Sequence, residues 1–517
     1  MSSFFEYGVL TVYFLSLTLL MVFGAHGFVM VYYYFKRWRA TDTRIPQPLR
    51  TFPRVTIQLP VFNEYYVVER LIRAACAIDY PRHLFEIQVL DDSTDDTLEI
   101  SRRCVTDMQR EGFDISLIHR KNRAGYKAGA LREGLANATG EFIAIFDADF
   151  VPPRDFLLRT LPYFEEAKTG LVQTRWGHLN PDYSLLTRAQ AIGLDGHFVV
   201  EQAARNGAGF FMNFNGTAGI WRKDCIIDAG NWADDTLTED LDLSYRAQLK
   251  GWKFKFLQDT VCFAELPSEI GALKSQQFRW TKGAIETAKK ILPSLWRARL
   301  PLNVKLQGTV HLTNNMVFPF IVIVSLLNLP LVLIKNVGAN DHSFYFAISS
   351  VFVIAFFGSF LMYLVSQKQI YGDWRRKILF FPVFMAGSMG LAINNTRAIL
   401  EGVVNYRSAF QRTPKYRIES GRDRYEEKKY YQARIKKFGL YNSGILECLA
   451  ALYIFAGILI TGYYAEFAAI PFQMMFCFGY AYIGLLSVRH SLLPVLRAKF
   501  ASAFWLSGRH KEALQSG

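Results

Sequence analysis

The chain has 517 residues, more than one ordinary domain holds, which predicts two or three structural units. Hydrophobic residues make up 51% of it and aromatic residues 15%, yet 20% are charged, so membrane segments must coexist with a body that faces water. The net charge of +14 does not indicate nucleic acid as a partner, because no segment repeats basic residues with stacking aromatics, and basic loops beside a membrane explain the excess.

The first element in the chain is an apolar stretch over 8–35 that ends in Lys36, Arg37 and Arg39. It is too long for the apolar region of a cleaved signal peptide and long enough to cross a bilayer with some tilt. We expect residues 1–39 to form an N-terminal transmembrane anchor, followed by a polar linker.

Short apolar runs then alternate with amphipathic stretches, and we assign 50–300 to one cytosolic domain with helices at the membrane interface. Strands are predicted over 54–60, 86–90, 115–119, 142–146 and 170–176. Helices are predicted over 64–77, 95–110, 125–136 and 155–166. This alternation predicts an α/β domain with a mostly parallel sheet, whose ligands bind beyond the carboxyl ends of the strands.

The second half of the chain is dominated by long apolar stretches. Four of them are long enough to cross a bilayer, namely 316–334, 343–365, 444–462 and 467–487. They predict membrane pairs within 308–366 and 443–490, with a basic cytosolic tail over 491–517. With the anchor, this gives five spans in an inner or plasma membrane or its equivalent.

Residues 378–404 are ambiguous, because Asn394, Asn395, Arg397 and Glu401 interrupt an otherwise apolar stretch. Both flanks of the stretch are basic, which favours the same, cytosolic side for both. We therefore expect 374–440 to hold an interfacial helix and a cytosolic segment, with a sixth span as the alternative.

Asp147 and Asp149 follow the predicted strand 142–146. Side chains two residues apart in a strand face the same way, so both carboxylates are expected to point into one pocket. Two carboxylates with open coordination positions suit Mg²⁺ or Mn²⁺ bound jointly with a diphosphate. A solvated turn is the alternative, and the apolar run before it argues against that.

Three further motifs are ambiguous when taken singly. Asp91 and Asp92 follow the strand 86–90, where an Asp-rich turn that caps the next helix is the simpler interpretation. In Thr238-Glu239-Asp240, one carboxylate is a candidate general base, and plain capping of a helix is equally favoured. Arg279 and Trp280 suit a diphosphate and a sugar ring, or an interfacial anchor.

Lys127 lies in a Gly-flanked segment that opens a helix, an arrangement typical of phosphate sites. Gly216 and Thr217 belong to a small-residue run that lets the backbone approach a ligand closely, although a plain turn is equally favoured. His178 and His197 have no ligand-like spacing and are expected to be structural.

Five motifs then occur in the order and spacing of family 2 processive glycosyltransferases, the cellulose synthase superfamily. They are Pro60-Val61-Phe62-Asn63-Glu64, Asp91-Asp92, Asp147-Ala148-Asp149, Thr238-Glu239-Asp240 and Gln276-Gln277-Phe278-Arg279-Trp280. The chain most resembles the mannan and glucomannan synthase branch, on the runs 214–222 and 251–254. The resemblance implies a GT-A (Rossmann-like) domain fused to an α-helical transmembrane bundle.

The resemblance also implies roles for individual residues. The residues implied to bind the nucleotide sugar are Pro60, Asn63, Glu64, Asp91, Asp92, Lys127, Asp147, Gln276 and Arg279. Asp240 would be the base, with Glu239 and Thr238 beside it, and Asp149 with Asp147 would hold the metal. The acceptor would contact Trp280, Gly216 and Thr217.

The run Phe410-Gln411-Arg412-Thr413-Pro414-Lys415 resembles the gating loop of cellulose synthases, with Phe410, Thr413 and Lys415 at the family's positions and Arg412 in place of the usual Val. The function implied is inverting transfer of a hexose from UDP-glucose or GDP-mannose to a growing β-linked polysaccharide that the bundle exports. Accessory export proteins are further candidate partners. A non-processive enzyme that makes a glycolipid, or a transporter with a decayed catalytic domain, are the alternatives.

Overall fold

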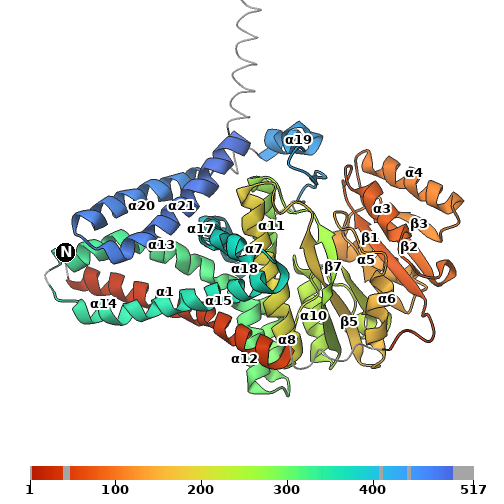
Figure 1. The fold of residues 1–517 in the computed structure, drawn as a ribbon, viewed down its shortest axis with the longest axis horizontal. Helices are drawn as coiled ribbons and strands as arrows, with labels where there is room; N and C mark the ends of the chain where they lie inside the picture. The colour runs from red at the N-terminus through yellow and green to blue at the C-terminus, as the bar shows by residue number, and fades with distance from the viewer. Residues whose placement is uncertain (1–2, 39–46, 339, 407–411, 439–443, 493–517) are drawn as a thin grey trace, which may run out of the picture.

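The computed structural model describes residues 3–38, 47–338, 340–406, 412–438 and 444–492. A sheet covered by helices forms one part of the molecule, and a bundle of long helices forms the other (Figure 1). The two parts lie side by side, with α11 (Ile270–Arg297) at the boundary between them.

Seven strands form one sheet in the order β3-β2-β1-β4-β6-β5-β7. They are β1 (Val55–Val61), β2 (Phe85–Asp91), β3 (Ile115–His119), β4 (Phe142–Ile145), β5 (Thr169–His178), β6 (Gly219–Arg222) and β7 (Lys253–Ala264). Only β6 runs antiparallel to its neighbours β4 and β5, so the expectation of a mostly parallel sheet is confirmed. Sequence reasoning missed β6 and β7.

Helices cover both faces of the sheet. They are α3 (Val68–Cys76), α4 (Thr97–Arg110), α5 (Tyr126–Asn137), α6 (Phe156–Thr160), α7 (Leu185–Asp195), α8 (Ala203–Ala208), α9 (Lys223–Asp228) and α10 (Glu239–Leu249). Ile57 of β1 belongs to a core shared with α3 and α4. Ile143 of β4 belongs to a second core shared with α5, α8 and α10.

The second core continues into the bundle. It includes Met30 and Val31 at the end of α1 (Ser3–Tyr33), Leu295 of α11 and Leu312 of α12 (Leu302–Thr313), all of them buried. Since burial of such side chains stabilises a fold by about 1.5–3 kcal/mol each, the sheet domain and the bundle share part of their stability.

The other helices of the bundle are α13 (Val317–Val337), α14 (Ser343–Ser349), α15 (Val353–Ile370), α16 (Trp374–Lys377), α17 (Phe381–Gly390), α18 (Ala392–Val403), α20 (Ile445–Tyr463) and α21 (Ile470–Ser487). Helix α19 (Lys429–Phe438) lies outside the bundle and contacts the sheet domain through Lys429 and Tyr430. Five segments are long and apolar enough to cross a membrane: Ser3–Lys36, Leu302–Val337, Ser343–Ile370, Ile445–Tyr463 and Phe467–His490. This number agrees with the five spans expected from the sequence.

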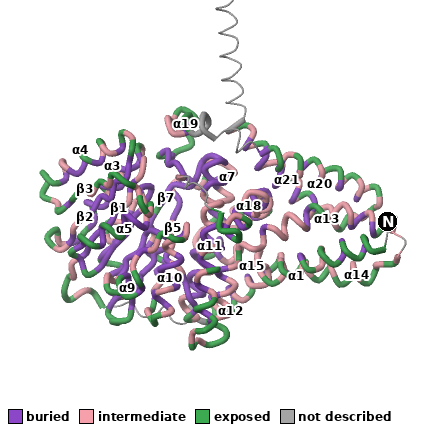
Figure 2. Tube along the Cα trace, turned by 180° about the vertical axis from the view of Figure 1, so that it is seen from behind, coloured by how far each residue is buried: buried purple, intermediate pink, exposed green. Residues whose placement is uncertain are grey.

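The outward faces of the bundle are apolar and exposed. Leu446, Leu449, Leu452, Phe455 and Leu459 are all more than half exposed along one stripe of α20. Figure 2 shows the same contrast, with exposed positions along α1, α14 and α20 and buried ones in the sheet. Exposed apolar stripes of this length suit contact with lipid.

The ambiguous stretch differs from the single interfacial helix that we predicted. It forms α17 and α18. Trp374–Gly390 and Ala392–Val403 are together long and apolar enough to cross a membrane, but they meet at a bend of 45°. Gly390 at the end of α17 lies in backbone contact with Gly479 of α21, and Asn395 of α18 is buried. Counting the bent pair as one span would give six.

The contact between α1 and α15 gives a test of the bundle. A Cβ placed on Gly27 would fall inside contact distance of the Gly358 carbonyl oxygen, whereas a Cβ on Gly8 would meet nothing within 4 Å. We expect Gly27→Ala to destabilise the protein by about 1–3 kcal/mol, because backbones in direct contact cannot admit a methyl group. Thermal unfolding in detergent measures this, with Gly8→Ala as the matched control; equal midpoints for the two variants would contradict the packing.

Candidate active site

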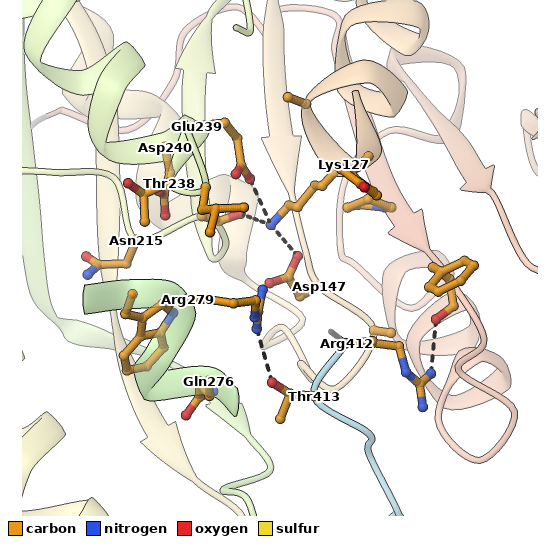
Figure 3. Close-up of a pocket in the computed structure, with 18 of the residues that line it drawn as sticks. Lys127, Asp147, Asn215, Thr238, Glu239, Asp240, Gln276, Arg279, Arg412 and Thr413 are labelled. Carbon is orange, nitrogen blue, oxygen red and sulfur yellow. Dashed lines mark hydrogen bonds and ion pairs between the residues drawn. The ribbon is translucent and has the colours of Figure 1, made fainter. Parts of the chain in front are cut away.

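One cavity of about 1040 Å³ lies at the carboxyl ends of β1, β2 and β4, between the sheet domain and α11. Most of the residues that the sequence singled out line it. These are Pro60, Glu64, Asp92, Lys127, Asp147, Asp149, Gly216, Thr238, Glu239, Asp240, Gln276, Arg279, Trp280, Thr413 and Lys415. Figure 3 shows how several of them converge from the sheet, α10, α11 and the chain after α18.

Three predicted residues do not line the cavity. Asp91 is fully buried. One of its carboxylate oxygens accepts a hydrogen bond from the Ser93 amide (2.7 Å) and the other from the Ser101 hydroxyl of α4 (2.6 Å), so neither faces the cavity. Asn63 binds Thr94 in the neighbouring loop, and Thr217 accepts from the Asp147 amide at 2.9 Å. Phe410 lies outside the described residues.

Asp92 is the member of its pair that reaches the cavity. The guanidinium of Arg120 binds it through two nitrogens, with Nε 2.7 Å from Oδ1, and both side chains are less than a tenth exposed. Beside them, the Arg123 guanidinium lies 3.3 Å from the centre of the Phe62 ring, and burial lowers the pKa of Arg123 to about 10. At this end of the cavity, Arg120 neutralises the Asp92 carboxylate, and the Arg123 cation lies over the face of the Phe62 ring.

Asp147 and Asp149 both line the cavity, but β4 ends at Ile145, so a turn and not strand alternation brings them there. Lys127 donates to Asp147 Oδ1 (2.6 Å) and to the Gly216 carbonyl (2.8 Å). Lys415 donates to Asp149 Oδ2 at 2.7 Å. Each carboxylate thus has its own lysine.

These two carboxylates fit a Mg²⁺ or Mn²⁺ ion that shares a diphosphate. Mg²⁺ is usually held through one or two carboxylates, with water and substrate phosphates completing its shell. No group of three or more His, Cys, Asp or Glu residues that could hold an ion unaided occurs in the described part of the chain. The donor set therefore suits an ion bound together with its substrate.

Asp240 lies in the first turn of α10, where Thr238 makes no side-chain capping bond. Burial raises the pKa of Asp240 to about 7, and the neighbouring Glu239 carboxylate adds to this shift. A Cβ on Gly216 would lie 2.9 Å from Asp240 Oδ2, so only glycine leaves room there. Asp240 is thus a carboxylate whose pKa suits a general base near neutral pH.

Arg279 projects into the cavity from α11, and its Nη2 donates to the Thr413 hydroxyl at 3.1 Å. Burial lowers the pKa of Arg279, while the nearby Glu239 and Asp147 carboxylates oppose this shift. Gln276 lies one turn earlier in α11 (Figure 3), and Trp280 directly follows Arg279; both line the cavity.

Residues 412–418, which we call the strap, lie between α18 and α19 in the chain. Three of them, Arg412, Thr413 and Lys415, line the cavity. Arg412 donates to the Phe62 carbonyl (3.0 Å) and lies 3.4 Å from Glu64, a carboxylate whose pKa burial raises to about 7 against the influence of Arg412. Arg412 thus binds at the carboxyl end of β1. The family resemblance did not predict this contact, because Arg412 stands where the family usually has Val.

Glu265 is a site residue that sequence reasoning missed. Its two oxygens accept from the amides of Tyr416 (3.0 Å) and Arg417 (2.8 Å), and its carbonyl accepts from Lys415. The strap is also anchored by Tyr416 and Ile418, which are buried with Tyr425 and Tyr431. An isolated Glu after a strand carries no sequence signal for such a clamp.

Comparisons with known proteins show what the chain is similar to. Residues 53–283 match the family described as "Glycosyltransferase like family 2". The chain is 41% identical over 269 residues to glucomannan 4-beta-mannosyltransferase 7 of Arabidopsis thaliana, over 51% of this chain and 48% of that protein. It is 46% identical over 246 residues to probable glucomannan 4-beta-mannosyltransferase 4 of Oryza sativa subsp. japonica, over 46% of this chain and 45% of that protein.

The match to these curated relatives therefore spans about half of their length. Among solved structures, a mannosyltransferase from Pyrobaculum calidifontis in complex with GDP-Man and Mn²⁺ is similar, with a TM-score of 0.53 and 18% identity over 76% of this chain and 100% of that chain. At this identity the likeness shows the fold alone, and the GT-A fold expected from the sequence is confirmed.

The Arg120–Asp92 pair gives a test of the cavity. We expect Arg120→Met to lower the free energy of unfolding by about 3–5 kcal/mol, because it leaves a buried carboxylate without its cation. Arg73→Met is the control, since the Arg73–Glu69 pair is about half exposed and is worth about 0.3–0.5 kcal/mol. Thermal unfolding in detergent compares the two, and equal losses would contradict the buried pairing.

Proposed function

We propose that the chain, whose residues 53–283 match the description "Glycosyltransferase like family 2", transfers hexose units, with inversion, from a nucleoside diphosphate sugar to a growing β-linked polysaccharide. The observation that carries the proposal is Asp240, a carboxylate with its pKa raised to about 7 in the cavity that also holds Asp147, Lys127 and Arg279. A general base is thus set beside groups that suit a diphosphate.

The chemistry follows from this arrangement. Asp240 takes the proton from an acceptor hydroxyl, whose oxygen attacks the anomeric carbon as the bond to the diphosphate oxygen breaks. Lys127 and Arg279 stabilise the negative charge that collects on the leaving diphosphate. A Mg²⁺ or Mn²⁺ ion held by Asp147 and Asp149 would neutralise part of the same charge. Trp280 offers a flat apolar face to a sugar ring.

The curated relatives are named for mannosyl transfer to glucomannan, which supports mannose as the sugar and a β-1,4 bond as the linkage. GDP-mannose is accordingly the proposed donor, with UDP-glucose as the second candidate. We further propose that the domain faces the cytosol and that the bundle exports the polymer, because the cavity lies against α11 where the two parts meet.

The product distinguishes the proposal from its rival. Purified protein in detergent, given radiolabelled GDP-mannose with Mg²⁺ or Mn²⁺, is expected to make insoluble polymer that a β-mannanase digests, and EDTA is expected to stop the reaction. UDP-glucose tested in parallel settles the donor. Label that appears only in a chloroform-soluble product would favour the non-processive glycolipid enzyme.

Asp240→Asn removes the base and keeps the shape of the side chain. We expect the rate of transfer to fall by about 10²–10⁴-fold, the usual contribution of a positioned general base. Asp107→Asn, on the exposed side of α4, is the control and should transfer at the wild-type rate. Undiminished transfer by Asp240→Asn would contradict the assigned role and favour a transporter or scaffold.

The raised pKa of Asp240 predicts a pH profile. The base must be ionised to act, so kcat/KM is expected to fall about tenfold per pH unit below about pH 7 and to level off above it. Initial rates between about pH 5.5 and 8.5, with protein stability checked at each pH, measure the profile. A rate that does not change across this range would exclude Asp240 as the titrating base.

A further inference from the structure

A π-helix, η4 (Gly196–Gln202), joins α7 to α8 beside the cavity. It is seated against span α15, because a Cβ on Gly196 would collide with the ring of Tyr363. Segments of π-helix often mark functional sites. This one places His197, Glu201 and Gln202 against the loop that carries Asn213 and Asn215.

Four hydrogen bonds fix how these side chains are oriented. Gln202 Nε2 donates to the Asn213 carbonyl (2.9 Å), which can only accept, and the same nitrogen donates to Asn215 Oδ1 (2.7 Å). The Asn215 amide therefore turns its nitrogen to His197 Nε2, 3.0 Å away. His197 Nε2 must accept this bond, so the ring proton lies on Nδ1 and is donated to Glu201 Oε2 at 3.0 Å.

The far end of the network is fixed by charge. Glu201 accepts from Arg205 Nη2 (2.9 Å) and Nε (3.1 Å), and Arg205 is fully buried. Burial alone would raise the pKa of Glu201, but Arg205 and His197 outweigh it and hold that pKa well below its usual range. Arg205 also reaches the Gln307 carbonyl of α12, so the network begins in the bundle.

The near end is at the reaction site. Asn215 lines the cavity and precedes Gly216, whose Cα lies against Asp240. In Figure 3, Asn215 lies on the Asp240 side, away from Arg412. Its amide nitrogen carries two hydrogens, and His197 is the one acceptor for them among the described residues. The second hydrogen is available to a ligand beside Asp240.

We propose that His197 is a positioning residue that holds the Asn215 amide with its nitrogen inward, so that its second N–H binds a hydroxyl of the acceptor sugar. This inference rests on the proposed function, since Asp240 as base places the acceptor on that side. Turned over, the amide would offer oxygen and could not donate. Gln202 and His197 together exclude that orientation from opposite ends of the amide.

A double-mutant cycle tests the inference. Wild type, His197→Phe, Asn215→Ala and the double variant are compared with GDP-mannose and a β-1,4-linked mannooligosaccharide as acceptor. We expect His197→Phe to raise the KM for the acceptor about 3–10-fold, the usual effect of one hydrogen bond, and to change the KM for the donor less than about twofold. In the Asn215→Ala background the same substitution should have almost no effect, because its only route is gone.

Two further variants keep the test decisive. His197→Gln, which can accept from Asn215 and donate to Glu201, is expected to restore the acceptor KM. If His197→Phe does not fold, Gln202→Met replaces it in the cycle. Asn206→Ala is the matched control, because Asn206 of α8 binds the backbone of Phe254 and Phe256 and does not touch Asn215. It should leave the acceptor KM unchanged.

The outcomes separate the two proposals. Additive effects in the cycle, or equal changes in donor and acceptor KM, would mean that His197 only supports the fold, and would overturn this inference alone. If wild-type protein transfers neither mannose from GDP-mannose nor glucose from UDP-glucose, the proposed function itself fails.

Discussion

Mutual repulsion among the carboxylates of one cavity is the constraint on which the active site depends. Asp92, Asp147, Asp149 and Glu64 face this space, and each has a cation of its own: Arg120, Lys127, Lys415 and Arg412. Asp240 has no such dedicated partner within ion-pair distance among the described residues, and burial together with the Glu239 carboxylate raises its pKa to about 7. Of these five carboxylates, Asp240 is therefore the one without a cation of its own in the described part of the chain, although burial also raises the pKa of the paired Glu64 to about 7.

Two of these cations come from the strap, more than 250 residues along the chain from the carboxylates that they neutralise. The strap is held by Glu265 and by the packing of Tyr416 and Ile418 against Tyr425 and Tyr431, and its Thr413 binds Arg279 of α11. The cavity is therefore assembled from the sheet, from α11 and from a segment between bundle helices. The core that runs from Ile143 to Met30 joins the sheet domain to α1, α11 and α12 through apolar packing.

The sequence was sufficient for what depends on local pattern. The end of a parallel strand places Asp147 and Asp92 at one edge, and helical spacing puts Gln276, Arg279 and Trp280 on one wall. The sequence could not decide which member of Asp91-Asp92 faces the cavity, because β2 ends at Asp91 and strand alternation does not extend to Asp92. What it could not supply depends on distant partners: the pairing of β7 with β5, the Glu265 clamp and the turn of the Asn215 amide.

The shared core has a consequence for how such chains diversify. The interior of the sheet domain continues into α1, α11 and α12, and the strap neutralises two of its carboxylates. Recombination therefore cannot transfer this domain to another membrane bundle as an independent unit. An exchange of the segment before α11 alone would introduce Asp149 and Glu64 without their partners Lys415 and Arg412. It would also separate the apolar core of the sheet domain from the part of that core in α11 and α12. Change in the cavity is then confined to substitutions within an intact chain, where each new side chain must suit both halves.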